Sequence, residues 1–201
     1  MIPKYIVMLV SGGLDSVTGL YDFHTQGHKI TVLGIDYGQR HVQELECARY
    51  HCHRLGVIFT RLTISPLKGS TLTDGSGGVV VPNRNSVFLS HAVNIAVASG
   101  SDTVMYFPNS NDEITFPDCR MAFVQTFNNM LRTSEINVEV CAPYINKTKW
   151  WIAGLSRNLG VDVSQTWSCY RGGKEPCGEC DACKKRKAAL EISCLKGVPV
   201  T

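Results

Sequence analysis

The sequence predicts an α/β protein with a doubly wound parallel sheet covered by helices on both faces. Short apolar runs alternate with segments of helical periodicity along most of the 201 residues, and parallel strands need such helical crossovers. A Ser-Gly-Gly-Leu-Asp-Ser turn, residues 11–16, joins the first apolar run to the first helical segment. Sheets of this class bind ligands at the carboxyl ends of their strands, where this turn falls. A cysteine-rich C-terminal segment follows.

Each predicted element has its own signal. Apolar runs predict strands over residues 5–10, 30–35, 57–64, 103–107 and 138–142. Helical spacing predicts helices over residues 15–26, 42–55, 85–99, 119–132, 148–159 and 181–195. Gly27, Gly56 and Gly100 end the first three helices, and Asp118 is expected to cap the fourth. Residues 65–82, rich in Gly, Ser and Thr, predict a mobile loop.

Bulk composition fits one substantial core. The chain is 44% hydrophobic and 18% charged, with a net charge of +3 that gives no strong case for a nucleic-acid partner. No apolar stretch is long enough to span a bilayer, and the N-terminus lacks a signal-peptide pattern, so a cytoplasmic protein is expected. We expect an α/β domain over residues 1–164 and a metal-binding tail over residues 165–201, packed on that domain.

The turn after the first strand predicts a phosphate site. Backbone N–H groups converge where a glycine-containing turn opens a helix, and the positive helix end faces the same point. Ser11 and Ser16 add hydroxyl donors. The turn lacks the Gly-Lys-Ser/Thr ending of a Walker A loop, which argues against transfer of a γ-phosphate. The alternative is an ordinary strand–turn–helix connection with a capping serine.

Four cysteines in the tail predict a metal centre. Cys169, Cys177, Cys180 and Cys183 have the spacing Cys-x7-Cys-x2-Cys-x2-Cys, which lets neighbouring thiolates converge on one ion. A closed set of four thiolates suits structural zinc. An iron–sulfur cluster is the main alternative, although the fourth cysteine lies upstream and no Cys-Pro follows. Disulfides are disfavoured in a cytosolic chain, and buried structural thiols do not explain the spacing.

Five further blocks carry a resemblance to a known family. They are Asp-Tyr-Gly-Gln-Arg-His at 36–41, Val-Pro-Asn-Arg-Asn at 81–85, Phe-Pro-Asp-Cys-Arg at 116–120, Lys-Thr-Lys at 147–149 and Thr-Trp-Ser-Cys-Tyr at 166–170. With the turn and the cysteines, they resemble the 7-cyano-7-deazaguanine (preQ0) synthases of the PP-loop ATP pyrophosphatase superfamily. The likeness runs from about Tyr5 to Leu190.

The resemblance implies an ATP-dependent ligase reaction. 7-Carboxy-7-deazaguanine and ammonia would give 7-cyano-7-deazaguanine through an adenylated carboxylate and an amide. ATP would be a substrate, with Mg²⁺ and structural Zn²⁺ as cofactors. The resemblance also suggests a homodimer, and no membrane or nucleic-acid partner is expected.

The resemblance also implies site residues. Nucleotide binding would use these positions: Val10, Ser11, Gly12, Gly13, Leu14, Asp15, Ser16, Asp36, Arg84 and Asn85. Arg84 and Lys147 would offset phosphate charge, and Asp15 would hold Mg²⁺ or orient the turn.

The remaining implied residues concern the deazaguanine. Asp118 would accept from the N–H groups of the base, Arg120 would pair with its carboxylate, and Arg40 and His41 would close over the site. Plain structural readings stay open: Asp118 and Asn85 as helix caps, and Arg40 and Lys149 as solvated surface.

Three other functions stay open. The reaction could stop at the amide or use another amine, because residues 107–112 depart from the family's usual glycine-containing, more polar segment. A PP-loop tRNA thiolation enzyme with an iron–sulfur cluster is a second alternative, disfavoured by the modest charge. A non-catalytic nucleotide-binding zinc module is the third, disfavoured by the intact turn.

Overall fold

The computed structural model describes residues 4–196, with side chains described as far as Cys194. A five-stranded sheet has the order β3-β2-β1-β4-β5, and every strand pair in it is parallel. The strands are β1 (Tyr5–Leu9), β2 (Lys29–Asp36), β3 (Ile58–Thr63), β4 (Thr103–Met105) and β5 (Glu139–Cys141). All five lie within the predicted runs or one residue beyond them. The chain winds outward from β1 in one direction through β2 and β3, then returns to place β4 on the other side of β1. The switch point therefore lies at the carboxyl end of β1.

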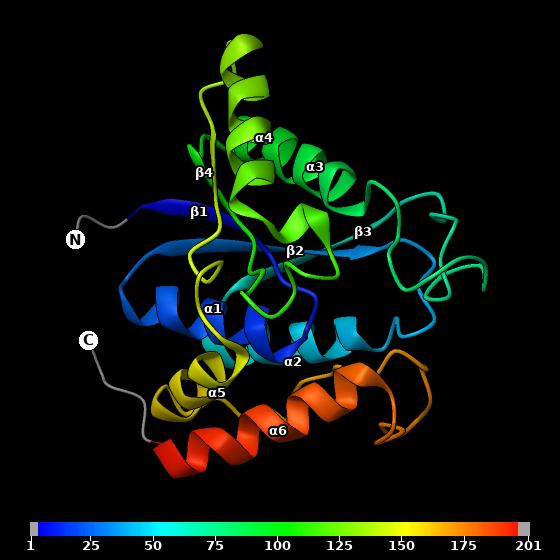
Figure 1. Ribbon diagram of the computed structural model, residues 1–201. Coiled ribbons are helices and arrows are strands. Elements are labelled where there is room, and N and C mark those ends of the chain that lie inside the picture. Colours follow the sequence, from blue (N-terminus) through cyan, green and yellow to red (C-terminus); the bar gives the residue numbers. More distant parts are fainter. Residues whose placement is uncertain (1–3, 197–201) are drawn as a thin grey trace.

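Helices cover both faces, which confirms the predicted fold class. They are α1 (Leu14–Thr25), α2 (Glu44–Leu55), α3 (Arg84–Ser99), α4 (Met121–Thr133), α5 (Lys149–Asn158) and α6 (Asp181–Lys196). Figure 1 shows α3 and α4 on one face and α1, α2 and α5 on the other, with α6 outside α5. Alternation along β1 explains the two layers: Val7 belongs to the apolar cluster beneath α3 and α4, and Ile6 and Met8 belong to the opposite one.

The start of α4 differs from the prediction. Residues Pro117–Cys119 form a short 3₁₀ turn, and Arg120 is extended, with φ −98° and ψ 150°. The helix therefore begins at Met121 with Arg120 at its N-cap, so the prediction that Asp118 caps it is wrong. Proline favours a tight turn here, and the extended Arg120 separates that turn from the helix. The capping reading of Asn85 is also wrong, because Asn83 precedes α3.

The cysteine-rich tail packs on the domain through α6. Ala189 of α6 lies in one apolar cluster with Leu14 of α1 and Ala153 of α5. Contact with the first turn of α1 brings the tail close to the switch point. The domain boundary at residue 164 stays a prediction. Within residues 4–196, the helices are all too short or too polar to cross a bilayer.

Candidate active site and metal centre

The turn between β1 and α1 has the geometry of an anion site. Gly12 has φ +93°, and a Cβ there would lie 1.8 Å from the carbonyl oxygen of Glu44. Only glycine fits, because the turn lies directly against the start of α2. Ser11 and Ser16 lie with their hydroxyls 3.3 Å apart, and no side chain at the Gly13 N-cap bonds the first amides of α1. These amides are therefore available to phosphate oxygens.

A cavity of about 270 Å³ opens beside this turn, at the carboxyl edge of the sheet. Nine of the residues predicted to bind nucleotide or substrate line it: Val10, Ser11, Gly13, Leu14, Asp15, Ser16, His41, Arg84 and Asn85. They come from the turn between β1 and α1, from α1 itself, from the segment before α2 and from α3, so the fold collects them from about 75 residues of chain. Apolar and aromatic side chains, including Leu33, Phe88 and Tyr106, form other parts of the wall. Such a mixture suits a purine-like ring joined to charged groups.

Three predicted residues from the first half of the chain lie outside this lining. Gly12 is buried within the turn, against the start of α2. Asp36 bonds Arg61, with 2.6 Å between Oδ2 and Nη2. Arg40 is exposed and lies against the loop at Gly75, where an added Cβ would be 2.9 Å from its Nη2.

Three predicted residues from the second half also lie outside the lining. Asp118 is half-buried beside the cavity, and its backbone carbonyl accepts from the Tyr106 hydroxyl. Arg120 is exposed and donates to the Glu113 carbonyl at 2.9 Å. Lys147 is exposed and lies 4.6 Å from the centre of the Trp151 ring. The predicted phosphate contact of Lys147 is therefore not formed in this structure and stays a prediction.

Lys149 takes the inward position in the Lys-Thr-Lys block. Its Nζ lies 2.6 Å from Oδ2 of Asp15, and its side chain is 15% exposed, so the solvated-surface reading of Lys149 is wrong. Burial lowers the pKa of Lys149, but the carboxylates of Asp15 and Asp112 outweigh burial and leave that pKa raised. The sequence feature that could have identified Lys149 is Thr148. Its hydroxyl caps α5, which places Lys149 in the first turn of that helix.

Asn109 links two carboxylates on the cavity wall. Its amide donates to Asp112 at 2.7 Å and to Asp15 at 3.2 Å. Burial raises the pKa of Asp112. Oδ1 of Asp15 is buried and, among the residues that the structure describes, has no hydrogen-bond partner. Oxygen ligands of this kind suit Mg²⁺ together with phosphate.

Arg84 brings an incompletely bonded guanidinium to the cavity. One of its terminal nitrogens donates to the Tyr37 hydroxyl at 3.4 Å, and the group lies 5.9 Å from the centre of that ring. Its Nε is buried and has no hydrogen-bond partner within residues 4–194. The N-terminus of α1 lines the same cavity as this guanidinium. A guanidinium with unused donors at such a place is suited to an anionic ligand.

Glu44 and His41 form a buried polar pair on the same wall. Oε1 of Glu44 lies 3.6 Å from Nε2 of His41 and accepts from Gln39 at 3.3 Å. Burial raises the pKa of Glu44 to about 8 and, with the charge of Arg84, lowers that of His41 to about 4. Nδ1 of His41 has no hydrogen-bond partner in the described part of the chain. Both groups are therefore mostly neutral at pH 7. Glu44 was not predicted from the sequence, because a glutamate in the first turn of a helix ordinarily only stabilises that end of the helix.

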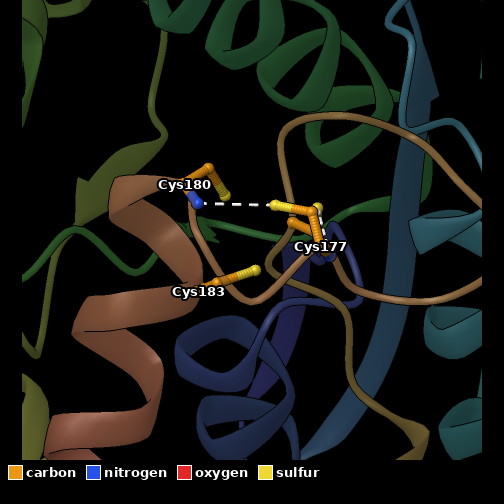
Figure 2. A group of neighbouring side chains, drawn as sticks. Cys177, Cys180 and Cys183 are labelled. Carbon is orange, nitrogen blue, oxygen red and sulfur yellow. Dashed lines mark hydrogen bonds between the residues drawn. The ribbon is translucent and has the colours of Figure 1, made fainter.

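The four tail cysteines converge on one point. Their Sγ atoms all lie within 4.8 Å of one another, and tetrahedral zinc places its sulfur ligands about 3.8 Å apart. Figure 2 shows Cys177, Cys180 and Cys183 directed inward, with the Cys180 amide donating to Cys177 at 3.4 Å. Backbone donors lower the pKa of Cys177 to about 6, whereas burial raises that of Cys183 to about 12. A bound cation would favour thiolate at both positions, so the residues fit a metal.

The tail also builds part of the cavity. Trp167, Ser168 and Tyr170 precede or flank the first cysteine, and Ala182 and Lys185 lie on α6; all five line the cavity. The Trp167 amide donates to the Gly12 carbonyl at 2.9 Å, which attaches the tail to the turn itself. The sequence pattern assigned the cysteines to a metal centre alone. Only the packing of the tail shows that this segment also forms part of the cavity wall.

The family described as queuosine biosynthesis protein QueC matches residues 5–193. The chain belongs to the QueC family. Two relatives named 7-cyano-7-deazaguanine synthase are 39% identical (Pseudoalteromonas translucida) and 36% identical (Methanoregula boonei), covering 94% and 92% of this chain and 95% and 93% of the relatives. The resemblance inferred from the sequence blocks is thereby confirmed.

Solved structures with a similar fold are more distant from this QueC-family chain. A U34-tRNA thiolase, NcsA, from Methanococcus maripaludis has a TM-score of 0.53 at 14% identity, over 94% of this chain and 64% of that one. An NMN synthetase from Francisella tularensis has a TM-score of 0.52 at 16% identity, over 100% of this chain and 80% of that one. These likenesses support the fold alone.

Proposed function

We propose that this QueC-family chain converts 7-carboxy-7-deazaguanine and ammonia into 7-cyano-7-deazaguanine, with ATP as the second substrate. The cavity at the switch point is the observation that carries the proposal. It joins an uncapped helix N-terminus and an incompletely bonded Arg84 to an aromatic wall, so one space offers sites for phosphates and for a heterocycle. The similarity to relatives named for this activity supports the same reading.

The chemistry needs positioning and charge stabilisation more than a protein nucleophile. The substrate carboxylate would attack the α-phosphate, and the amides at the start of α1 would hold the departing pyrophosphate. Arg84, with Nε unpartnered, would stabilise charge that develops on the α-phosphate. Ammonia would then displace AMP to give the amide. A second ATP would activate the amide oxygen, and loss of that oxygen with AMP would leave the nitrile.

Two metal ions are part of this proposal. Asp15 and Asp112 would hold Mg²⁺, which supplies charge neutralisation for the phosphates. Zn²⁺ would occupy the four-cysteine centre in a structural role, since a closed thiolate shell leaves no open position for a substrate. A homodimer and a cytoplasmic location stay predictions.

The direct test is product analysis by mass spectrometry. Purified protein with 7-carboxy-7-deazaguanine, ammonium, Mg²⁺ and ATP is expected to release AMP and to form first the amide and then the nitrile. A lasting amide with ATP in excess would contradict nitrile formation and direct attention to residues 107–112. AMP formation that instead requires tRNA would favour the thiolation alternative. Absence of AMP under all conditions would favour a non-catalytic nucleotide-binding module.

Replacing Arg84 with alanine is expected to slow adenylate formation by about 100- to 1,000-fold, the usual cost of losing one preorganised donor to transition-state charge. The measurement is ATP–pyrophosphate exchange that depends on the deazaguanine. We expect the melting temperature to change little, because within residues 4–194 the Arg84 side chain makes a single hydrogen bond, to Tyr37. Arg49→Ala is the matched control, since Arg49 is exposed and pairs with Glu46. Exchange at the unaltered rate in Arg84→Ala would remove Arg84 from the site.

A further inference from the structure

The proposed reaction removes three protons from one nitrogen atom. Ammonia carries three hydrogens and a nitrile nitrogen carries none, so proton removal must occur repeatedly at one position. A base at that position contributes substantially to rate when it has access both to the nitrogen and to water. The following inference rests on the proposed function and concerns which side chain does this.

The geometry points to Glu44: we propose that its carboxylate accepts the protons lost by the attacking nitrogen during amide and nitrile formation. Glu44 lines the cavity and begins α2. Its own backbone carbonyl lies directly beneath Gly12 of the phosphate-binding turn. Glu44 therefore lies beside the turn proposed to hold the phosphates, on the wall of the cavity in which the adenylated carbon would form.

The other cavity carboxylates are already engaged. Asp15 forms a 2.6 Å ion pair with Lys149, and Asp112 accepts from Asn109 at 2.7 Å. Both also suit a magnesium ion. Within residues 4–194, the polar side-chain partners of Glu44 are Gln39 and the neutral His41, and no lysine or arginine lies in ion-pair contact with it. A carboxylate free of a cation keeps its basicity.

The surroundings of Glu44 set its charge state. His41 precedes it in the same segment, Cys47 follows on α2, Tyr37 comes from the end of β2, and Arg84 comes from α3. Burial raises the pKa of Glu44 to about 8, and hydrogen bonding from Gln39 and the charge of Arg84 only partly oppose it. A base with a pKa near the working pH both takes up and releases a proton readily.

The steps balance with the substrates already named. In the first, a C–N bond forms, the C–O bond to AMP breaks with its electron pair leaving on AMP, and one nitrogen proton passes to Glu44. Glu44 then releases that proton to water. In the second, the amide oxygen bonds to the α-phosphorus and pyrophosphate leaves. Two further protons pass in turn from the nitrogen to Glu44 and on to water as the C–O bond breaks, its electron pair leaves on AMP, and the nitrile forms.

The test separates adenylation from amination in the full-length protein carrying its metal. Glu44→Gln is expected to keep ATP–pyrophosphate exchange within about threefold, while amide formation in a single turnover falls by about 100- to 10,000-fold. Glu44→Asp should recover part of that loss. Glu46→Gln is the control, because Glu46 is exposed on the same helix.

The pH profile provides the readout that a merely structural role would not change. At a fixed concentration of free ammonia, the wild-type amination rate should rise with pH through about 8 and then level off, because the carboxylate form of Glu44 predominates only above its pKa of about 8. Glu44→Gln should be flat over this range. Equal losses of exchange and amination, or normal amination, would overturn the proposal. If wild-type protein shows no exchange at all, the proposed function fails instead.

Discussion

Replacing Gly12 with alanine is expected to lower ATP–pyrophosphate exchange by about 100-fold or more. The new Cβ would lie 1.8 Å from the Glu44 carbonyl, and the φ of +93° disfavours any other residue. The turn and the start of α2 must separate, so the amides of α1 move relative to Arg84. Displacements of about 1 Å commonly cost about 100-fold in rate. Exchange kinetics and ATP affinity are the measurements.

Gly27→Ala supplies the matched control. Gly27 also has positive φ, +81°, but nothing lies within 4 Å of its added Cβ. This variant should lose about 1 kcal/mol of stability from backbone strain and keep its exchange activity. Together the two variants separate the strain of positive φ from the clash with Glu44. Unchanged exchange in Gly12→Ala would show that the turn does not position the phosphates.

Replacing Cys169 with serine is expected to release the metal and to reduce ATP binding at the same time. Wild-type protein should contain one zinc ion per chain and lack the broad visible absorption of an iron–sulfur cluster. Structural zinc commonly contributes about 10 kcal/mol or more to the folding of small zinc modules. Without it, the tail should detach and remove Tyr170 and Lys185 from the cavity wall. Metal analysis, thermal unfolding and ATP titration are the measurements.

Cys194→Ser is the control for that experiment. Cys194 is exposed on α6, outside the four-cysteine centre, so the zinc content and ATP affinity should stay at wild-type values. Loss of metal with full ATP affinity in Cys169→Ser would contradict a shared wall between tail and cavity. Visible absorption with bound iron would overturn zinc and restore the iron–sulfur alternative.

The order of elements followed from the sequence because each depends on local patterns. Apolar runs and helical spacing predicted all five strands and six helices, and the cysteine spacing predicted the metal centre. The start of α4 escaped prediction since Pro117 and the extended Arg120 override the capping tendency of Asp118. In the Lys-Thr-Lys block, the pattern alone did not determine which lysine lies inward.

The sequence by itself therefore determined the parallel α/β class, the phosphate-binding turn and the four-thiolate centre, because these depend on spacing within short segments. Only the tertiary structure decided which charges meet. Lys149 pairs with Asp15, which is 134 residues away in the sequence. The packing of α2 places the backbone carbonyl of Glu44 against Gly12. Burial then raises the pKa of Glu44, a change that no linear pattern contains. Charge states in an active site depend on desolvation and distant partners, and both arise only when the chain is folded.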